Sequence, residues 1–258
     1  MAQKFLSPHG SSKTLSPMVE RACRHWEARG RAAAAKQDLS PHSSHALTVT
    51  ISREAGTSGT QVAQEVGKRL QWHVYDQDLL ERIAEEMGVR AALLETVDER
   101  QQSWLMESIA SFLSMPGKSA GELVVSESAF VRHLVETVLA LGVHGQCIIV
   151  GRAASFILAP ETTLRVRLVA PLQTRVAAMQ SSFKLSAKEA AGRVRSIDRQ
   201  RIEFVKDHFF KDPTDPRGYD IVLNAQQFSL AQRAELICLA LEQLQKTHLS
   251  KGNGAAPA

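Results

Sequence analysis

LTVTISREAGTSGTQ, residues 47–61, is the stretch that decides the fold. Apolar side chains alternate at Leu47, Val49 and Ile51, which is typical of a β-strand. A loop containing two glycines follows this strand. Apolar residues then recur at helical spacing, at Val62, Ala63, Val66 and Leu70. A strand, a glycine-containing loop and a helix in this order are the layout of a phosphate-binding loop, because backbone N–H groups and the helix N-terminus attract an anion.

The loop departs from the usual phosphate-binding pattern G-x-x-x-x-G-K-[ST]. Arg53 and Ser58 stand where the two glycines belong, and Gly59 replaces the lysine. Thr60 keeps the hydroxyl position that would contact Mg²⁺. A plain turn between a strand and a helix, which uses glycine for its backbone freedom, fits the same residues. The loop alone therefore leaves both interpretations open.

Composition indicates an ordinary soluble globular protein. The chain has 258 residues, of which 44% are hydrophobic and 22% are charged, enough for one main domain with an appendage. No apolar run is long enough for a membrane span, and the first residues lack the apolar core of a signal peptide. Three cysteines lie far apart without metal-ligand spacing, which argues against zinc and a disulfide framework. We therefore expect a cytoplasmic protein.

The net charge of +4 comes from the first 45 residues, which hold seven basic and three acidic side chains. The rest of the chain is neutral, and no basic stripe with interleaved aromatic residues follows, so we expect no nucleic-acid partner. Residues 1–45 form a basic, partly disordered leader with one possible helix over 18–36, which fits a docking or solvated helix and, less well, a membrane-surface segment. Residues 46–248 form the main domain, and residues 249–258 form a disordered tail. Nothing in the pattern indicates an oligomeric state.

Five strand candidates alternate with helices along the main domain. The first is the alternating segment that starts at Leu47, and the others cover residues 72–75, 147–150, 164–170 and 220–224. Helices are predicted over 79–87, across most of 88–144, after Pro171, from Ser186 and from Ser229. Alternation of this kind predicts an α/β fold with a five-stranded parallel sheet sandwiched between helices.

Polar residues at the ends of two strands are candidate ligand contacts. Asp76 and Asp78 follow the second strand, where they could bind a base, a ribose or a metal; Asp76 could equally cap the next helix. Arg152 follows the buried strand 147–150, and a cation at that position is costly unless it meets an anion. The anion could belong to a ligand or to a structural ion pair.

The helix that begins at Ser186 carries several arginines, among them Arg195, Arg199 and Arg201. Arg195 and Arg199 are four residues apart and share a face. Such a run usually forms a solvated surface. Because this helix lies between two strands and ends in an irregular loop, it also has the arrangement of an arginine-bearing lid over a phosphate site.

Several separated stretches together resemble the cytidylate kinase-like family, a branch of the nucleoside monophosphate kinases. They occur in one order: Ile51-Ser52-Arg53-Glu54 with Gly56 and Gly59, Tyr75-Asp76, Ile149-Val150-Gly151-Arg152, Asp198-Arg199-x-Arg201, Asp215-Pro216 and Tyr219-Asp220-Ile221-Val222-Leu223-Asn224. The resemblance covers about residues 46–245. It implies a P-loop kinase αβα sandwich with a helical lid, and transfer of the ATP γ-phosphate to CMP or dCMP with Mg²⁺.

The resemblance also implies roles for individual residues. The acceptor nucleotide would lie near Asp76 and Asp78 and would be gripped through its phosphate by Arg152, while Thr60 would approach Mg²⁺. Lid and catalytic roles would fall to Arg195, Arg199 and Arg201. The donor phosphates would be held around residues 53–60, with contacts from Ser52, Glu54, Gly56, Thr57, Ser58, Gly59 and Thr60.

The missing lysine is the main departure from the kinase pattern. Phosphoryl transfer needs positioning and cations more than covalent help, so the loss of a cation should weaken the transition state. Arg53 is the nearby basic residue, and we hypothesise that its side chain turns inward to replace the lysine. A catalytically degenerate nucleotide-binding regulatory module is the alternative, and a kinase for another small acceptor is a third possibility.

Overall fold

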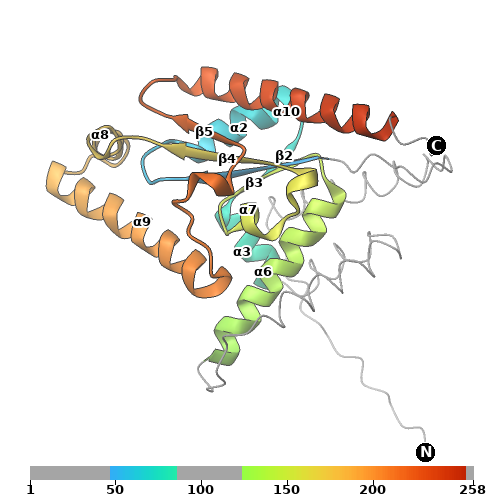
Figure 1. Ribbon diagram of the computed structural model, residues 1–258. Helices are drawn as coiled ribbons and strands as arrows, with labels where there is room; N and C mark the ends of the chain where they lie inside the picture. The colour runs from blue at the N-terminus through green and yellow to red at the C-terminus, as the bar shows by residue number, and fades with distance from the viewer. Residues whose placement is uncertain (1–46, 86–123, 254–258) are drawn as a thin grey trace, which may run out of the picture.

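The computed structural model describes residues 47–85 and 124–253 (Figure 1). The predictions for the leader 1–45, for residues 88–123 and for the last residues of the tail lie outside this part of the chain. Within it, no helix is both long and apolar enough to cross a membrane.

All five predicted strands are present and form one parallel sheet with the order β2-β3-β1-β4-β5. The third strand has the predicted bounds, and the bounds of the other four differ by one or two residues. Strand β1 is Thr48–Arg53, β2 is His73–Tyr75, β3 is Cys147–Val150, β4 is Thr163–Val169 and β5 is Ile221–Asn224. The segment quoted first therefore occupies the centre of the sheet. The prediction of an α/β fold with a five-stranded parallel sheet is confirmed.

Strand β1 is buried on both sides, as expected for the middle of a parallel sheet. Val49 and Ile51 are fully buried on one side, and Thr48 and Thr50 are buried too. The hydroxyl of Ser155, just after β3, donates to the Thr50 hydroxyl at 3.0 Å. The two threonines that alternate with Val49 and Ile51 are thus covered by protein and do not face water.

Helices cover both faces of the sheet (Figure 1). Helices α2, Gly59–Leu70, and α10, Leu230–Asn253, share one hydrophobic core with β1 and β4. The other core joins helices α3, α6, α7 and α9, which span Gln77–Glu85, Val124–His144, Ala154–Ile157 and Ala187–Phe209. Helix α8, Leu172–Phe183, packs with α9 against the loop after β1. Two 3₁₀ turns, η1 at Pro160–Thr162 and η2 at Pro216–Gly218, precede β4 and β5.

Capping fixes the starts of the last two long helices. Ser186 and Glu189 form the predicted capping box at the start of α9, and Ser229 and Gln232 exchange the equivalent bonds before α10. Helix α10 continues to Asn253, beyond the residue 248 at which the main domain was expected to end.

Candidate functional site

The loop between β1 and α2 has the strand–loop–helix layout expected from the sequence. Gly56 has a φ of 85°, and a Cβ there would overlap the backbone carbonyl of Arg175. Ser58 has a φ of 58° and stands at the N-cap of α2 without a side-chain cap bond. Glycine at position 56 is therefore required both by the backbone conformation and by the close approach of α8.

Three side chains from distant elements hold the loop in shape. The Ala55 N–H donates to Asp198 Oδ1 at 2.7 Å, and the Ala55 carbonyl accepts from Arg175 Nη1 at 3.4 Å. The Thr57 carbonyl accepts from Arg233 Nη1 at 2.6 Å. Because Asp198 belongs to α9 and Arg233 to α10, the loop is fastened to both faces of the domain.

Arg175 is neutralised by two carboxylates. Its Nε lies 3.2 Å from Glu54 Oε2, and its Nη1 pairs with Asp198 Oδ2. Glu54 also accepts from the Ala170 N–H at 3.0 Å. The structure thus places Glu54, expected at the donor phosphates, in a network that ties the loop to the start of α8.

Arg53 lies over the beginning of α2 and reaches the end of β3. A Cβ on Gly59 would touch the Arg53 side chain, and a Cβ on Gly151 would overlap Arg53 Nη1. The Arg53 carbonyl accepts from Arg201 Nη1 at 3.1 Å. Burial, followed by the nearby charges of Arg201 and Arg152, lowers the pKa of Arg53 to about 9. This environment favours an anion beside the guanidinium.

Arg152 projects from a turn of unusual backbone conformation. Gly151, Arg152 and Ala153 have φ values of 80°, 50° and 58°. A left-handed conformation costs about 1–2 kcal/mol for a residue with a Cβ, and such strain is concentrated at functional sites. The guanidinium lies 5.2 Å from the centre of the Phe204 ring. Burial lowers the pKa of Arg152, and the nearby charge of Arg201 lowers it further. Burial also lowers the pKa of Arg201.

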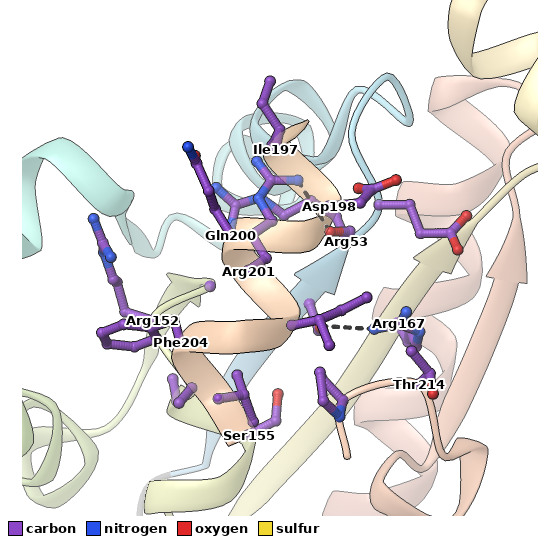
Figure 2. A pocket seen from close by; sticks show the side chains of 18 of the residues that line it. Arg53, Arg152, Ser155, Arg167, Ile197, Asp198, Gln200, Arg201, Phe204 and Thr214 are labelled. Carbon is purple, nitrogen blue, oxygen red and sulfur yellow. Dashed lines mark hydrogen bonds between the residues drawn. The ribbon is translucent and has the colours of Figure 1, made fainter. Parts of the chain in front are cut away.

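These residues line a cavity of about 580 Å³ between the carboxyl ends of the strands and α9 (Figure 2). Its lining includes five arginines, which are Arg53, Arg152, Arg167, Arg175 and Arg201. The two carboxylates among its lining residues, Glu54 and Asp198, both pair with Arg175. The cavity therefore has an excess of three positive charges, a pattern typical of a site for a phosphorylated ligand.

A smaller cavity of about 160 Å³ covers the loop itself. Ser58, Gly59 and Thr60 line it, together with Arg201 and residues of α8 such as Phe183. The Thr57 hydroxyl donates within the loop, to the Glu54 carbonyl at 2.8 Å. In the described part of the chain no cluster of three histidine, cysteine or acidic residues could hold a metal ion. Mg²⁺ still fits here if nucleotide phosphates and water supply most of its oxygen ligands and the Thr60 hydroxyl adds one.

Asp76 and Asp78 lie at the edge of the site and outside the lining of the larger cavity. Asp76 Oδ1 accepts from the Leu79 N–H at 3.1 Å, so Asp76 caps α3, which begins at Gln77. Burial lowers the pKa of both Arg53 and Arg152. The charges of Asp76 and Asp78 partly oppose this lowering at Arg53, and the charge of Asp78 does so at Arg152. The capping interpretation of Asp76 is thus confirmed, and both aspartates act on the arginines through space.

Arg195 and Arg199 do not line the large cavity and are separated there from Arg53, Arg152 and Arg201, although Arg175 lines both places. Both are exposed and line a shallow depression of about 520 Å³ on α9 with Leu172 and Lys206. Arg201, on the same helix, lines the large cavity instead. The three arginines expected in one lid are therefore divided between two places.

Sequence analysis did not predict three arginines that lie at the site. They are Arg167, Arg175 and Arg233, and each is less than a tenth exposed. Arg167 lies in β4, where it alternates with Val166 and Leu168, a pattern that is also typical of a strand with one face in water. One signal was available, because a parallel sheet with helices on both faces buries both sides of each strand. Arg175 and Arg233 stand in helices and carried no comparable signal.

Comparison with known proteins gives consistent results. The sequence matches the cytidylate kinase-like family over residues 48–227. A cytidylate kinase from Methanopyrus kandleri is 28% identical over 109 residues, which cover 39% of this chain; the match spans only 56% of that protein. An uncharacterized protein from Eubacterium ventriosum has a similar structure, with a TM-score of 0.56 and 18% identity, over 78% of this chain and 98% of its own.

A shikimate kinase from Bacteroides thetaiotaomicron aligns with a TM-score of 0.41 and 12% identity, over 78% of this chain and 98% of its own.

The family match extends over more than half of the chain and runs from the first residue of β1 to just beyond β5. It includes the loop at residues 53–60, Arg152 and the arginines of α9. The chain, an α/β fold with a five-stranded parallel sheet, therefore belongs to the cytidylate kinase-like family.

Proposed function

We propose that this protein is a nucleotide kinase that transfers the γ-phosphate of ATP to CMP or dCMP. One observation carries the proposal: Arg53, Arg152 and Arg201 come from β1, the turn after β3 and α9, and converge on one cavity beside the glycine-containing loop. Both carboxylates that line this cavity pair with Arg175, and the three guanidinium groups give the cavity the positive charge and the N–H donors that suit phosphate oxygens.

The donor phosphates are held over the loop, with backbone contacts from Gly56 to Thr60 at the N-terminus of α2. Arg53 takes the place of the missing lysine, which its position over Gly59 and beside Gly151 supports. When bound, Mg²⁺ supplies charge neutralisation to the β- and γ-phosphates, and Thr60 offers it a hydroxyl. The site fits this ion without an acidic cluster.

The acceptor occupies the larger cavity with its phosphate against Arg152. Arg201 lines both cavities, so its guanidinium is placed to stabilise the group in transfer. Fixed cations of this kind need no reorganisation during the reaction, and this preorganisation is the source of their catalytic effect.

The reactants are nucleotides, so we also propose a cytoplasmic location, which cell fractionation would test.

A panel of acceptors tests the proposal directly. Purified protein is incubated with Mg-ATP and each of CMP, dCMP, UMP, AMP and GMP, and the diphosphate product is measured. We expect a preference for the cytidine nucleotides and a fall of about 10²–10³-fold in kcat/KM for Arg152→Ala. Arg69→Ala is the matched control, because Arg69 pairs with Glu65 at the far end of α2; its rate should not change.

A non-catalytic nucleotide-binding module is the second candidate, and a specific contact favours it. The Ala55 N–H, which a phosphate-binding loop would direct at its anion, already donates to Asp198 at 2.7 Å. A loop without lysine and with one amide occupied binds an anion but is less suited to transfer. ATP binding by the folded protein without turnover of any acceptor would support this candidate and contradict the kinase.

A further inference from the structure

Arg167 is a buried cation that the reaction above does not use. It lies in β4, opposite Ser52 of β1 in the strand register, and is only 8% exposed. It lines the large cavity from the sheet side, together with Pro213 and Thr214 of the loop before β5. In Figure 2, Arg167 and Arg152 lie on opposite sides of the α9 segment.

The contacts of Arg167 are all with uncharged groups. Its Nη1 donates to Ser52 Oγ at 3.2 Å and to the Tyr219 hydroxyl at 3.3 Å, and its guanidinium lies 5.4 Å from the Tyr219 ring centre. None of the contacts that it makes within residues 47–85 and 124–253 is to a carboxylate. A buried guanidinium is costly unless an anion accompanies it, so this arrangement calls for a negatively charged ligand.

Two neighbouring arginines make the contrast clear. Arg165, two residues earlier in β4, holds Asp220 with two nitrogens, at 2.7 and 3.2 Å. Arg175 has Glu54 and Asp198. Both of these arginines stabilise the fold through carboxylates. The buried Arg233 instead donates to the Thr57 and Ser229 carbonyls and, unlike Arg167, does not line the large cavity. Among the residues that the structure describes, Arg167 has no carboxylate partner, although it is at least as buried as Arg175.

Ser52 provides a second donor at the same place. The Tyr219 hydroxyl lies 2.9 Å from the Pro213 carbonyl, which can only accept, so its proton is directed there. Ser52 Oγ accepts from Arg167 and also lies 3.2 Å from the Tyr219 hydroxyl oxygen, so the Ser52 proton can be directed at that oxygen or at a ligand oxygen in the cavity. A guanidinium and a hydroxyl that meet at a cavity wall are a donor pair suited to a phosphate group.

We propose that Arg167 and Ser52 form a second phosphate subsite in the large cavity, separate from the one at Arg152. The ligand of the cavity then carries two phosphate groups, or one phosphorylated ligand binds together with a free phosphate ion. This inference deepens the proposed function, since it changes the acceptor class from a monophosphate to a bisphosphorylated compound or adds phosphate as a second ligand.

Binding experiments test the subsite without reference to turnover. Thermal unfolding and calorimetry are run on the full chain with inorganic phosphate, CMP and cytidine 3′,5′-bisphosphate. The variants are Arg167→Met and, as the matched control on the same strand, Arg165→Met. We expect the bisphosphate to bind the wild type at least about 10-fold more tightly than CMP, and Arg167→Met to remove this difference while CMP affinity is kept.

Two further results complete the test. If free phosphate is the ligand, it will stabilise the wild type at saturating CMP and will not stabilise Arg167→Met. Without ligand, Arg167→Met should melt at the same or a higher temperature than the wild type, because it removes an uncompensated buried charge. Should that variant fail to fold, Ser52→Ala provides the same comparison and should lose part of the phosphate effect.

The proposal would be overturned if the wild type, Arg167→Met and Ser52→Ala responded equally to all three ligands. It would also be overturned if Arg167→Met melted at a lower temperature than the wild type and every phosphate effect stayed unchanged. The outcome is independent of catalysis. A protein with no kinase activity that still shows the Arg167-dependent phosphate effect keeps the subsite and loses the proposed reaction. An active CMP kinase that lacks the Arg167-dependent phosphate effect keeps the proposed reaction and loses the subsite.

Discussion

The two faces of helix α9 carry the same residue type in different surroundings. On the inner face, Arg201 donates to the Arg53 carbonyl and lines both cavities. On the outer face, Arg195 and Arg199 are exposed and line a shallow depression. Positions 199 and 201 are separated by about 200° around a helix axis, because each residue adds roughly 100°. The angular position of an arginine around the helix axis, rather than its proximity in sequence, therefore decides whether it can contact a phosphate.

Turnover should show the largest difference between the two faces. Arg201→Ala should lower kcat/KM for CMP phosphorylation by about 10²–10³-fold, because it removes a fixed cation beside the transferred group. Arg199→Ala, on the outer face, should change it by less than about 3-fold. Steady-state kinetics of both variants would check this. Equal losses would mean that α9 moves during the reaction and presents its outer arginines to the substrate.

Stability should show the next difference, at Asp198. Asp198→Ala leaves Arg175 with one carboxylate and the Ala55 N–H without its acceptor, so it should lower the free energy of unfolding by about 2–3 kcal/mol. Asp215→Ala breaks an exposed pair with Arg217 and should lower the free energy of unfolding far less, because water and salt screen such a pair. Urea unfolding measures both. A small loss at Asp198 would show that the network contributes little to holding the loop.

Two glycines allow a smaller and more local test. Gly151→Ala places a methyl group on Arg53 Nη1 at a residue with a φ of 80°, so it should displace Arg53 and lower kcat/KM by about 10-fold. Wild-type activity in this variant would contradict the role of Arg53 as the substitute for lysine.

Gly192→Ala is the matched change on α9, and it should have the smallest effect. Apart from its chain neighbours and the backbone of α9 itself, no atom of the described residues lies within 4 Å of the added Cβ, and alanine is the better helix former. The free energy of unfolding should rise by about 0.5–1 kcal/mol, with kcat/KM unchanged. Reduced activity would show that the exposed side of α9 takes part in the reaction after all.

The sequence predicted the fold well because local pattern carries it. Apolar runs located every strand to within two residues, and serine with glutamate or glutamine marked the starts of α9 and α10. Strand order could not be obtained in this way, since it depends on how segments about a hundred residues apart pair. The placement of β1 between β3 and β4 emerged only from the structure.

The site was predicted less completely. Arg53, Arg152 and Arg201 were found because they stand at the end of a strand, in the turn after a strand, or in a family motif, and the structure brings all three to one cavity. Arg167 was missed, since an arginine that alternates with valine and leucine resembles a water-facing residue. Arg195 and Arg199 were grouped with Arg201 by position in sequence, although the helical period separates them.

The strand order also has a consequence for synthesis. Val49 of the central strand pairs with Ile148 and Leu164, so its first partner is made about a hundred residues later. During translation the emerging chain carries an apolar strand with both edges open, which is a template for mispairing with other chains. Closure of the sheet must wait for β3 and β4 to leave the ribosome, and long-range parallel pairing of this kind forms slowly.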